Sequence, residues 1–150
     1  DRIFETNVSS AFFIGQAITV PTSQIYTVSG YFKKGVGRDW IALSSTGGAS
    51  AVWFNINTGV VGSASSTVLD KDIISVGNGW YLCWVSNIGV NTIRAYLADI
   101  SGNASYAGNS ANYVSAWGLQ VTDGVGPKPL TTTTTTAINA NAYGGRVILI

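Results

Sequence analysis

The chain contains no histidine and a single cysteine, Cys83. Without histidine it cannot form a Ser-His-Asp triad, a Cys-His dyad or most zinc sites. One cysteine excludes a disulfide within the chain, so cysteine usage says little about the redox compartment. Cys83 falls between Tyr81 and Val85 on the aliphatic side of an expected strand. We therefore expect a small buried side chain there, and not a nucleophile.

Charge is also scarce, because only 10% of the 150 residues are charged and the net charge is +1. An average soluble domain has about 25% charged residues. Nucleic-acid binding would need a strong basic excess, so no nucleic-acid partner is expected. Lys33, Lys34 and Arg38 form the one basic cluster, which we interpret as a solvated edge.

Long hydrophobic runs are missing too. No segment approaches about 18 uninterrupted apolar residues, so neither a transmembrane helix nor membrane insertion is expected. The chain begins at Asp1 without a signal peptide, which predicts a processed product or an excised fragment. Hydrophobic residues make up 46% of the chain, which is enough for the core of one domain.

Short runs rich in β-branched and aromatic residues alternate with Gly, Asn, Ser and Asp, and no helical period is sustained. This pattern predicts an all-β domain, either a two-sheet sandwich or a barrel. Turns such as Gly77-Asn78-Gly79 contain residues that accept positive φ. The expected strands are Phe12–Val20, Ile25–Lys34, Asp39–Ser45, Ala51–Asn57, Val60–Ala64, Asp72–Val76, Trp80–Ser86, Thr92–Ala98 and Asn112–Val121.

The domain is expected to end near Pro127-Lys128-Pro129, because two prolines disfavour a helix and a central strand. We therefore expect a sandwich domain over residues 1–129, followed by a Thr-rich extended segment and an apolar tail over 130–150. The apolar end at Arg146–Ile150 should not lie bare in water. It is expected to pack either on its own domain, as a final edge strand, or on another chain.

Side chains alternate across a strand, so each can be assigned to one of two sides. One side is aliphatic and predicts the core between the sheets, as in Val28 and Phe32, Val52 and Phe54, or Ile93 and Leu97. The other side mixes aromatic with polar and basic residues. A sugar-binding surface needs this mixture, because a pyranose ring stacks on a flat aromatic while its hydroxyls bond to polar side chains.

The candidate glycan-binding residues share this mixed side: Tyr31, Arg38, Trp40, Trp53, Asn55, Trp84, Arg94 and Tyr96. Trp53 and Trp84 are expected to be the most exposed, and Trp80 and Trp117 the most structural. The alternative for each aromatic is that it packs in the core or is covered by a loop or a partner chain.

Catalysis is not expected. A glycosidase uses two carboxylates about 5–10 Å apart, and the one close pair, Asp70 and Asp72, is expected in a loop around Lys71. No cofactor is expected either. Calcium at Asp70 and Asp72, or at Asp99 with Ser101 and Asn103, would need about six to eight oxygen ligands. Asx-type turns explain both clusters better.

Four segments add a resemblance: Tyr26–Gly35, Val52–Gly59, Gly77–Cys83 and Ala116–Gln120. Their order and spacing resemble the concanavalin-A-like, carbohydrate-binding-module-like jelly-roll domain of bacteriophage tail, fibre and head-spike proteins. The resemblance runs from about Phe12 to about Pro129. It implies an antiparallel two-sheet β-sandwich (jelly roll) and a place on the surface of a virion.

Two positions depart from that family. It often has Arg where Leu82 stands and a polar residue where Trp84 stands. Two apolar side chains side by side on the mixed face indicate either a stronger stacking platform or a surface that a neighbouring chain buries.

These observations favour a non-catalytic virion module that binds host-surface or environmental glycans for attachment. Stacking is expected on Trp84, Trp53, Trp40 or Tyr96, with hydrogen bonds from Asn55, Arg94 and Arg38. Single-site affinity should be weak, with avidity from multivalent display. The alternative is a structural fibre or capsid-decoration protein whose aromatic face and C-terminal tail contact protein. The expected partners are a glycan, other virion proteins and, in a fibre, further copies of the chain in a trimer.

Overall fold

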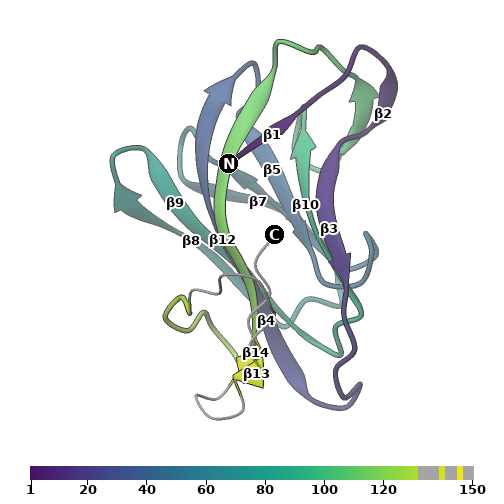
Figure 1. Ribbon diagram of the computed structural model, residues 1–150, viewed down its shortest axis with the longest axis vertical. Coiled ribbons are helices and arrows are strands. Elements are labelled where there is room, and N and C mark those ends of the chain that lie inside the picture. The colour runs from purple at the N-terminus through teal and green to yellow at the C-terminus, as the bar shows by residue number, and fades with distance from the viewer. Residues whose placement is uncertain (132–138, 141–144, 147–150) are drawn as a thin grey trace.

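The computed structural model describes residues 1–131, 139–140 and 145–146. They form an antiparallel sandwich of two five-stranded β-sheets (Figure 1), which confirms the predicted fold class. Among these residues there is no helix long and apolar enough to span a membrane.

The two sheets of the sandwich are named sheet I and sheet II. Sheet I has the strand order β1 (Arg2–Phe4), β12 (Tyr113–Asp123), β4 (Ile25–Val36), β9 (Trp80–Ile88) and β8 (Asp70–Gly77). Sheet II has the order β3 (Phe13–Ala17), β10 (Thr92–Ala98), β5 (Trp40–Ser44), β6 (Ala51–Asn55) and β7 (Val60–Ala64). Two short pairs complete the described strands: β2 (Ser9–Ala11) with β11 (Ser105–Ala107), and β13 (Asn139–Ala140) with β14 (Gly145–Arg146).

Every strand expected from the sequence is present, with shifted ends in most cases. β7 and β10 have the predicted bounds, whereas β8 begins at Asp70 and not at Asp72. The expectation that Asp70 and Asp72 lie in a loop is therefore wrong. β1, β2 and β11 were not expected, because three residues are too few to show an alternating pattern.

The turn between β8 and β9 shows the predicted backbone conformation. Gly77, Asn78 and Gly79 have φ values of 91°, 51° and 75°. Asn78 is the one non-glycine residue with positive φ in the part of the chain that the structure describes. Asparagine tolerates this region better than other side chains, so the sequence can close a tight hairpin here.

The core between the sheets consists of the predicted aliphatic set. Val28 and Phe32 of sheet I meet Val52, Phe54 and Ile93 of sheet II, and all five are almost fully buried. Cys83 is buried in the same core, as expected, and burial raises the pKa of its thiol well above the ordinary value.

After β12 the chain folds back over the outer face of sheet I, in a segment, Gly124–Leu130, that we call the strap. Three hydrogen bonds fasten it: Thr27 Oγ1 donates to Gly124 O, Gly126 N to Ser86 Oγ, and Gln120 Nε2 to Lys128 O. These outward-facing polar side chains of sheet I are consequently buried. Of the predicted tail, residues 132–138, 141–144 and 147–150 lie outside the described residues, and the packing expected for Arg146–Ile150 falls largely on them.

Candidate functional site

The mixed set of side chains lies on two outer faces, on opposite sides of the sandwich. Trp40, Trp53, Asn55, Arg94 and Tyr96 share the outer face of sheet II. Tyr31 and Trp84 lie on the outer face of sheet I. The expectation of one mixed face is therefore wrong, because alternation assigns a side of a strand without telling which sheet the strand joins.

The outer face of sheet II has a hollow of 220 Å³ between two aromatic side chains. The register places Ala42 of β5 directly between Tyr96 of β10 and Trp53 of β6. The two aromatic residues are thus two interstrand spacings apart, about 9–10 Å between Cα atoms. Ala42 is small and has no exposed surface, so it forms the floor of the hollow, and its ring-bearing walls are the buried Tyr96 and the half-buried Trp53.

The rim of the hollow comes from the loop that follows β10. Asn103 and Ser105 line it, together with Gly48 on the opposite side. Asp99 Oδ1 accepts hydrogen bonds from Ile100 N at 2.8 Å and from Asn103 Nδ2 at 3.0 Å. Asp99 therefore acts in an Asx-type turn that holds Asn103 at the rim, in line with the predicted turn.

Glycine is required at position 48 by both backbone and space. Gly48 has a φ of 120°, and a Cβ there would lie 3.1 Å from the Tyr96 hydroxyl. A larger residue would thus press on one wall of the hollow. Trp53, on the other wall, is half-buried, and its buried Nε1 donor has no hydrogen-bond partner in the structure.

Arg94 stands beside the hollow and is held in place from two directions. Its Nη1 donates to Gly47 O at 2.8 Å and to the Tyr96 hydroxyl at 3.0 Å. Its guanidinium carbon lies 4.5 Å above the centre of the Phe13 ring. The hollow thus combines flat rings with small apolar floor residues, and Arg94 contacts its Tyr96 wall without lining it.

Trp40 and Asn55 share the next row of the sheet and take part in internal contacts. Asn55 Oδ1 accepts hydrogen bonds from Asn57 N and Thr58 N, so it caps the turn after β6. A Cβ on Gly62 would lie 2.5 Å from the Trp40 ring, which shows that the indole lies against the backbone of β7. Neither residue lines the hollow.

Arg38 was expected to bind a glycan, and the structure places it instead in a buried ion pair with Glu5. Its Nε and Nη2 donate to the two carboxylate oxygens of Glu5, whose side chain has no exposed surface. Glu5 also accepts hydrogen bonds from the Tyr106 hydroxyl, Asn109 N and Asn112 Nδ2. This Glu5 cluster occupies the guanidinium, so Arg38 is not available to a ligand.

The Glu5 cluster also shifts the pKa values of its members. Burial alone would raise the pKa of Glu5, but hydrogen bonds from Arg38, Asn109 and Tyr106 outweigh it and lower that pKa below the ordinary value. Burial and the Glu5 carboxylate raise the pKa of Tyr106 well above the ordinary value. Glu5 is therefore a carboxylate and Tyr106 a neutral donor near neutral pH.

On the outer face of sheet I, two expectations about tryptophan are wrong. Trp84 is only 8% exposed, whereas Trp117, expected to be structural, is 53% exposed. The register aligns Ile74, Leu82, Tyr31 and Trp117 across four neighbouring strands, a set that we call the apolar row. Tyr31 and Trp117 are in ring contact, with centroids 5.3 Å apart. Tyr31 thus belongs to a second aromatic surface, on the other side of the molecule from the hollow.

Asp70 and Asp72 both point outward from β8, beside Ser86 and Trp84. Alternate residues on one strand are about 6.7 Å apart, so two carboxylates do share this face, contrary to the sequence interpretation. Both are exposed on an edge strand, and each Oδ1 accepts a hydrogen bond from the next backbone N–H. In the part of the chain that the structure describes, no group of three or more His, Cys, Asp or Glu side chains could hold a metal ion.

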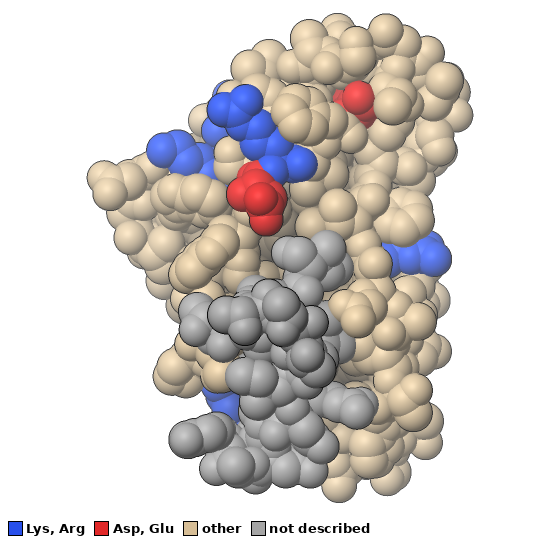
Figure 2. Space-filling model, in the orientation of Figure 1, with Lys and Arg blue, Asp and Glu red and all other residues tan. Residues whose placement is uncertain are grey.

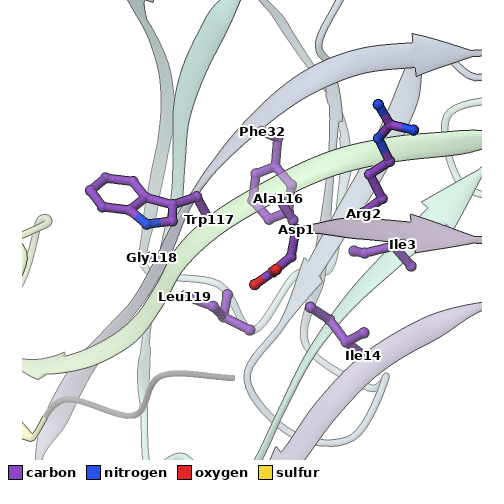
Figure 3. A pocket seen from close by; sticks show the side chains of 9 residues that line it. All are labelled: Asp1, Arg2, Ile3, Ile14, Phe32, Ala116, Trp117, Gly118 and Leu119. Atoms are coloured by element: carbon purple, nitrogen blue, oxygen red, sulfur yellow. The ribbon is translucent and has the colours of Figure 1, made fainter. Parts of the chain in front are cut away.

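Two further hollows have mixed walls of apolar and polar residues. One, with a volume of 180 Å³, lies at the sandwich edge, where β1 and β12 approach β3, and Ile3, Ile14 and Leu119 are on its walls (Figure 3). The Trp117 indole points away from those three side chains. The other, of 480 Å³, lies among Ile18, Val20, Ile88 and Val90 and the loops beside them. Polar residues also line both: Asp1 and Arg2 in the first, and Thr22, Thr46 and Asn91 in the second.

Basic side chains gather near the N-terminus around an acidic one (Figure 2). Two members of the predicted basic cluster have acidic partners: Lys34 forms an ion pair with Asp39 at 2.6 Å, and Arg38 pairs with Glu5.

No protein-family model matches this chain, and no curated protein is significantly similar to it.

Proposed function

We propose that this protein is a non-catalytic module of a bacteriophage virion that binds glycans in the hollow on the outer face of sheet II. The hollow between Trp53 and Tyr96, with Ala42 as its floor, carries this proposal. A volume of 220 Å³ lies below the range of about 300–1,000 Å³ for drug-sized ligands, and it suits a single sugar ring.

The chemistry of the walls fits a saccharide. The apolar face of a pyranose stacks on an aromatic ring, and Trp53 is the half-buried ring on one wall of the hollow. Hydroxyl groups need donors and acceptors, which Asn103 and Ser105 provide at the rim. A shallow site of this size gives weak affinity per copy, so attachment would depend on many copies in one particle.

A glycan array probed with the multivalently displayed protein tests the proposal. We expect selective binding that Trp53→Ala weakens about tenfold or more, because stacking and apolar burial are both lost. Trp53→Phe keeps a flat ring and should retain part of the affinity. Trp117→Ala, on the opposite face, is the matched control and should bind as the unmodified protein does.

An array without binding, from protein whose thermal unfolding is cooperative, would refute the glycan-binding function. Binding that Trp117→Ala removes and Trp53→Ala leaves intact would place the site on sheet I.

The apolar row favours a second candidate function, that of a structural fibre or capsid-decoration protein. Ile74 and Trp117 at its ends are 46% and 53% exposed. Tyr31 and Leu82 between them are half-buried, and exposed apolar side chains aligned in this way are typical of protein contacts. In that case Trp117→Ala should impair assembly of the particle and leave the isolated domain folded.

A further inference from the structure

We infer that the saccharide bound in the hollow carries an N-acetyl group, whose methyl contacts the alanine lining and whose amide bonds to Asn103 or Ser105 at the rim. This inference rests on the proposed glycan-binding function and specifies the class of ligand. It comes from the size of the lining side chains, their neutrality, and the hydrogen-bonding capacity that remains at the rim.

The lining of the hollow consists mostly of very small residues. Of the nine described residues that line it, five carry a single methyl group or no side chain: Ala11, Ala42, Gly48, Ala51 and Ala104. They come from β2, β5, β6 and the loops that follow β5 and β10. A methyl group gains free energy when it leaves water for such a surface. A hydroxyl group in the same place would lose its bonds to water without a replacement.

The lining is also uncharged. Among the residues that the structure describes, no Asp, Glu, Lys or Arg side chain lines the hollow. Arg94 reaches it only through the Tyr96 hydroxyl, at 3.0 Å. A free amino group on the sugar would therefore bring a positive charge toward Arg94 without an acidic partner, which is unfavourable. A neutral substituent suits this site better.

Asn103 is held at the rim by both atoms of its amide. Its Nδ2 donates to Asp99 Oδ1 at 3.0 Å, and its Oδ1 accepts from Ser105 N at 3.2 Å. An asparagine amide has two N–H groups and two lone pairs, so one of each remains. The Ser105 hydroxyl has no hydrogen-bond partner within the described part of the chain. The rim thus offers neutral donors and acceptors to a ligand.

The short β2–β11 pair brings a polar and an apolar lining residue together. Its register places Ser105 of β11 opposite Ala11 of β2, and both line the hollow. Side chains opposed in this way have Cβ atoms about 4.5–5.5 Å apart. An N-acetyl group joins an amide, with one N–H and one C=O, directly to a methyl group. One substituent of this kind could contact the polar rim and the alanine lining together.

Matched pairs of methyl glycosides test the inference, titrated against the ¹⁵N-labelled protein by NMR. One pair is the glycosides of N-acetylglucosamine and glucose, and the other those of N-acetylgalactosamine and galactose. Within each pair an N-acetyl group replaces one hydroxyl. We expect at least one N-acetyl member to bind about tenfold or more tightly than its partner, because a methyl is buried and no hydroxyl is left unpaired. Saturation transfer from the protein should be strongest at its acetyl methyl protons. The methyl rhamnoside, which has a ring methyl but no amide, should bind more weakly than that member.

A matched pair of variants locates the contact. Ala11→Val adds two carbon atoms to the lining and should reduce the preference for the N-acetyl member about fivefold or more, because the space for the methyl is filled. Valine suits a strand, so the fold should persist. Ala107→Val, an exposed position of β11 outside the lining, is the control and should leave the preference unchanged.

The failures of the two proposals are distinguishable. If the members of each pair bind equally, or the rhamnoside binds as tightly as the N-acetyl members, and Trp53→Ala abolishes that binding, the N-acetyl inference fails while the glycan-binding function stands. The same conclusion follows if the array shows binding only to glycans without N-acetyl groups. If none of these glycosides nor any array glycan binds, both fail.

Discussion

The Glu5 carboxylate, fully enclosed and shared by four partners, permits a quantitative test of the stability of the fold. Glu5→Gln keeps the shape of the side chain but presents an NH₂ group to donors of Arg38, Tyr106, Asn109 or Asn112. It also leaves the largely buried Arg38 guanidinium without its counter-charge. Breaking a buried ion pair by removing one partner costs about 3–5 kcal/mol. For a domain of this size each kcal/mol lowers Tm by about 2–4 °C, so the expected fall is roughly 6–20 °C.

The effect should depend on pH in a defined direction. Because the pKa of Glu5 is lowered in the folded state, its contribution to stability is complete above the ordinary carboxyl pKa. That contribution is lost as the pH falls through the lowered pKa. Urea unfolding at pH 7 and near pH 2.5 should therefore show a large difference between Glu5→Gln and the unmodified protein at pH 7, and a smaller one in acid. Asp72→Asn, on an exposed edge, is the control. A difference below about 1 kcal/mol at pH 7, or one unchanged in acid, would refute this account.

Three further predictions concern stability and reactivity. Trp84→Ala should lower the free energy of unfolding by about 3–5 kcal/mol in urea titrations, because the indole is only 8% exposed. The exposed Trp117 is the control, and Trp117→Ala should lower it by less than about 1 kcal/mol. Equal losses would contradict the burial of Trp84. Gly37→Ala should lower Tm measurably, because the φ of Gly37 is 75° and the new Cβ would lie 2.0 Å from the Asn112 side chain. An unchanged Tm would show that the loop relaxes to accommodate the methyl group. Cys83 should react with a thiol reagent only when the protein unfolds, because burial encloses the sulfur and raises the pKa of the thiol. Labelling in native buffer that is faster than unfolding would contradict the burial of this side chain.

Much of the fold is predictable from the sequence because the core pattern is strong. Val52 and Phe54 alternate with Trp53, and Ile93 and Leu97 with Arg94, so a period of two identifies strands and their buried side. The turn at Asn78 is likewise specified by its glycine neighbours. Strands of three residues and the strap have no such pattern, and only tertiary contacts define them.

The candidate site is less predictable, because it depends on which strands are neighbours. Trp53 and Tyr96 are far apart in the sequence, and only the pairing of β5 with both β6 and β10 brings them to one hollow. Ala42 is inconspicuous until that pairing is known. Trp84 was expected to be exposed because it alternates with core residues along its strand. Alternation does not reveal whether an outward-facing side chain is itself buried, as Trp84 is. Glu5 is a single charged residue near the start of the chain, and nothing in the sequence indicates that Arg38 pairs with it.

The back-to-back placement of the two outer faces has a geometric consequence for display. The apolar row is on sheet I and the hollow on sheet II, so the full thickness of the sandwich separates them. A copy that adhered to a larger body through the apolar row would turn the hollow toward the surrounding medium. Attachment through the apolar row and ligand binding in the hollow would then be independent, so that either surface could be mutated without disturbing the other. Neighbouring copies side by side would present their binding sites in a common direction.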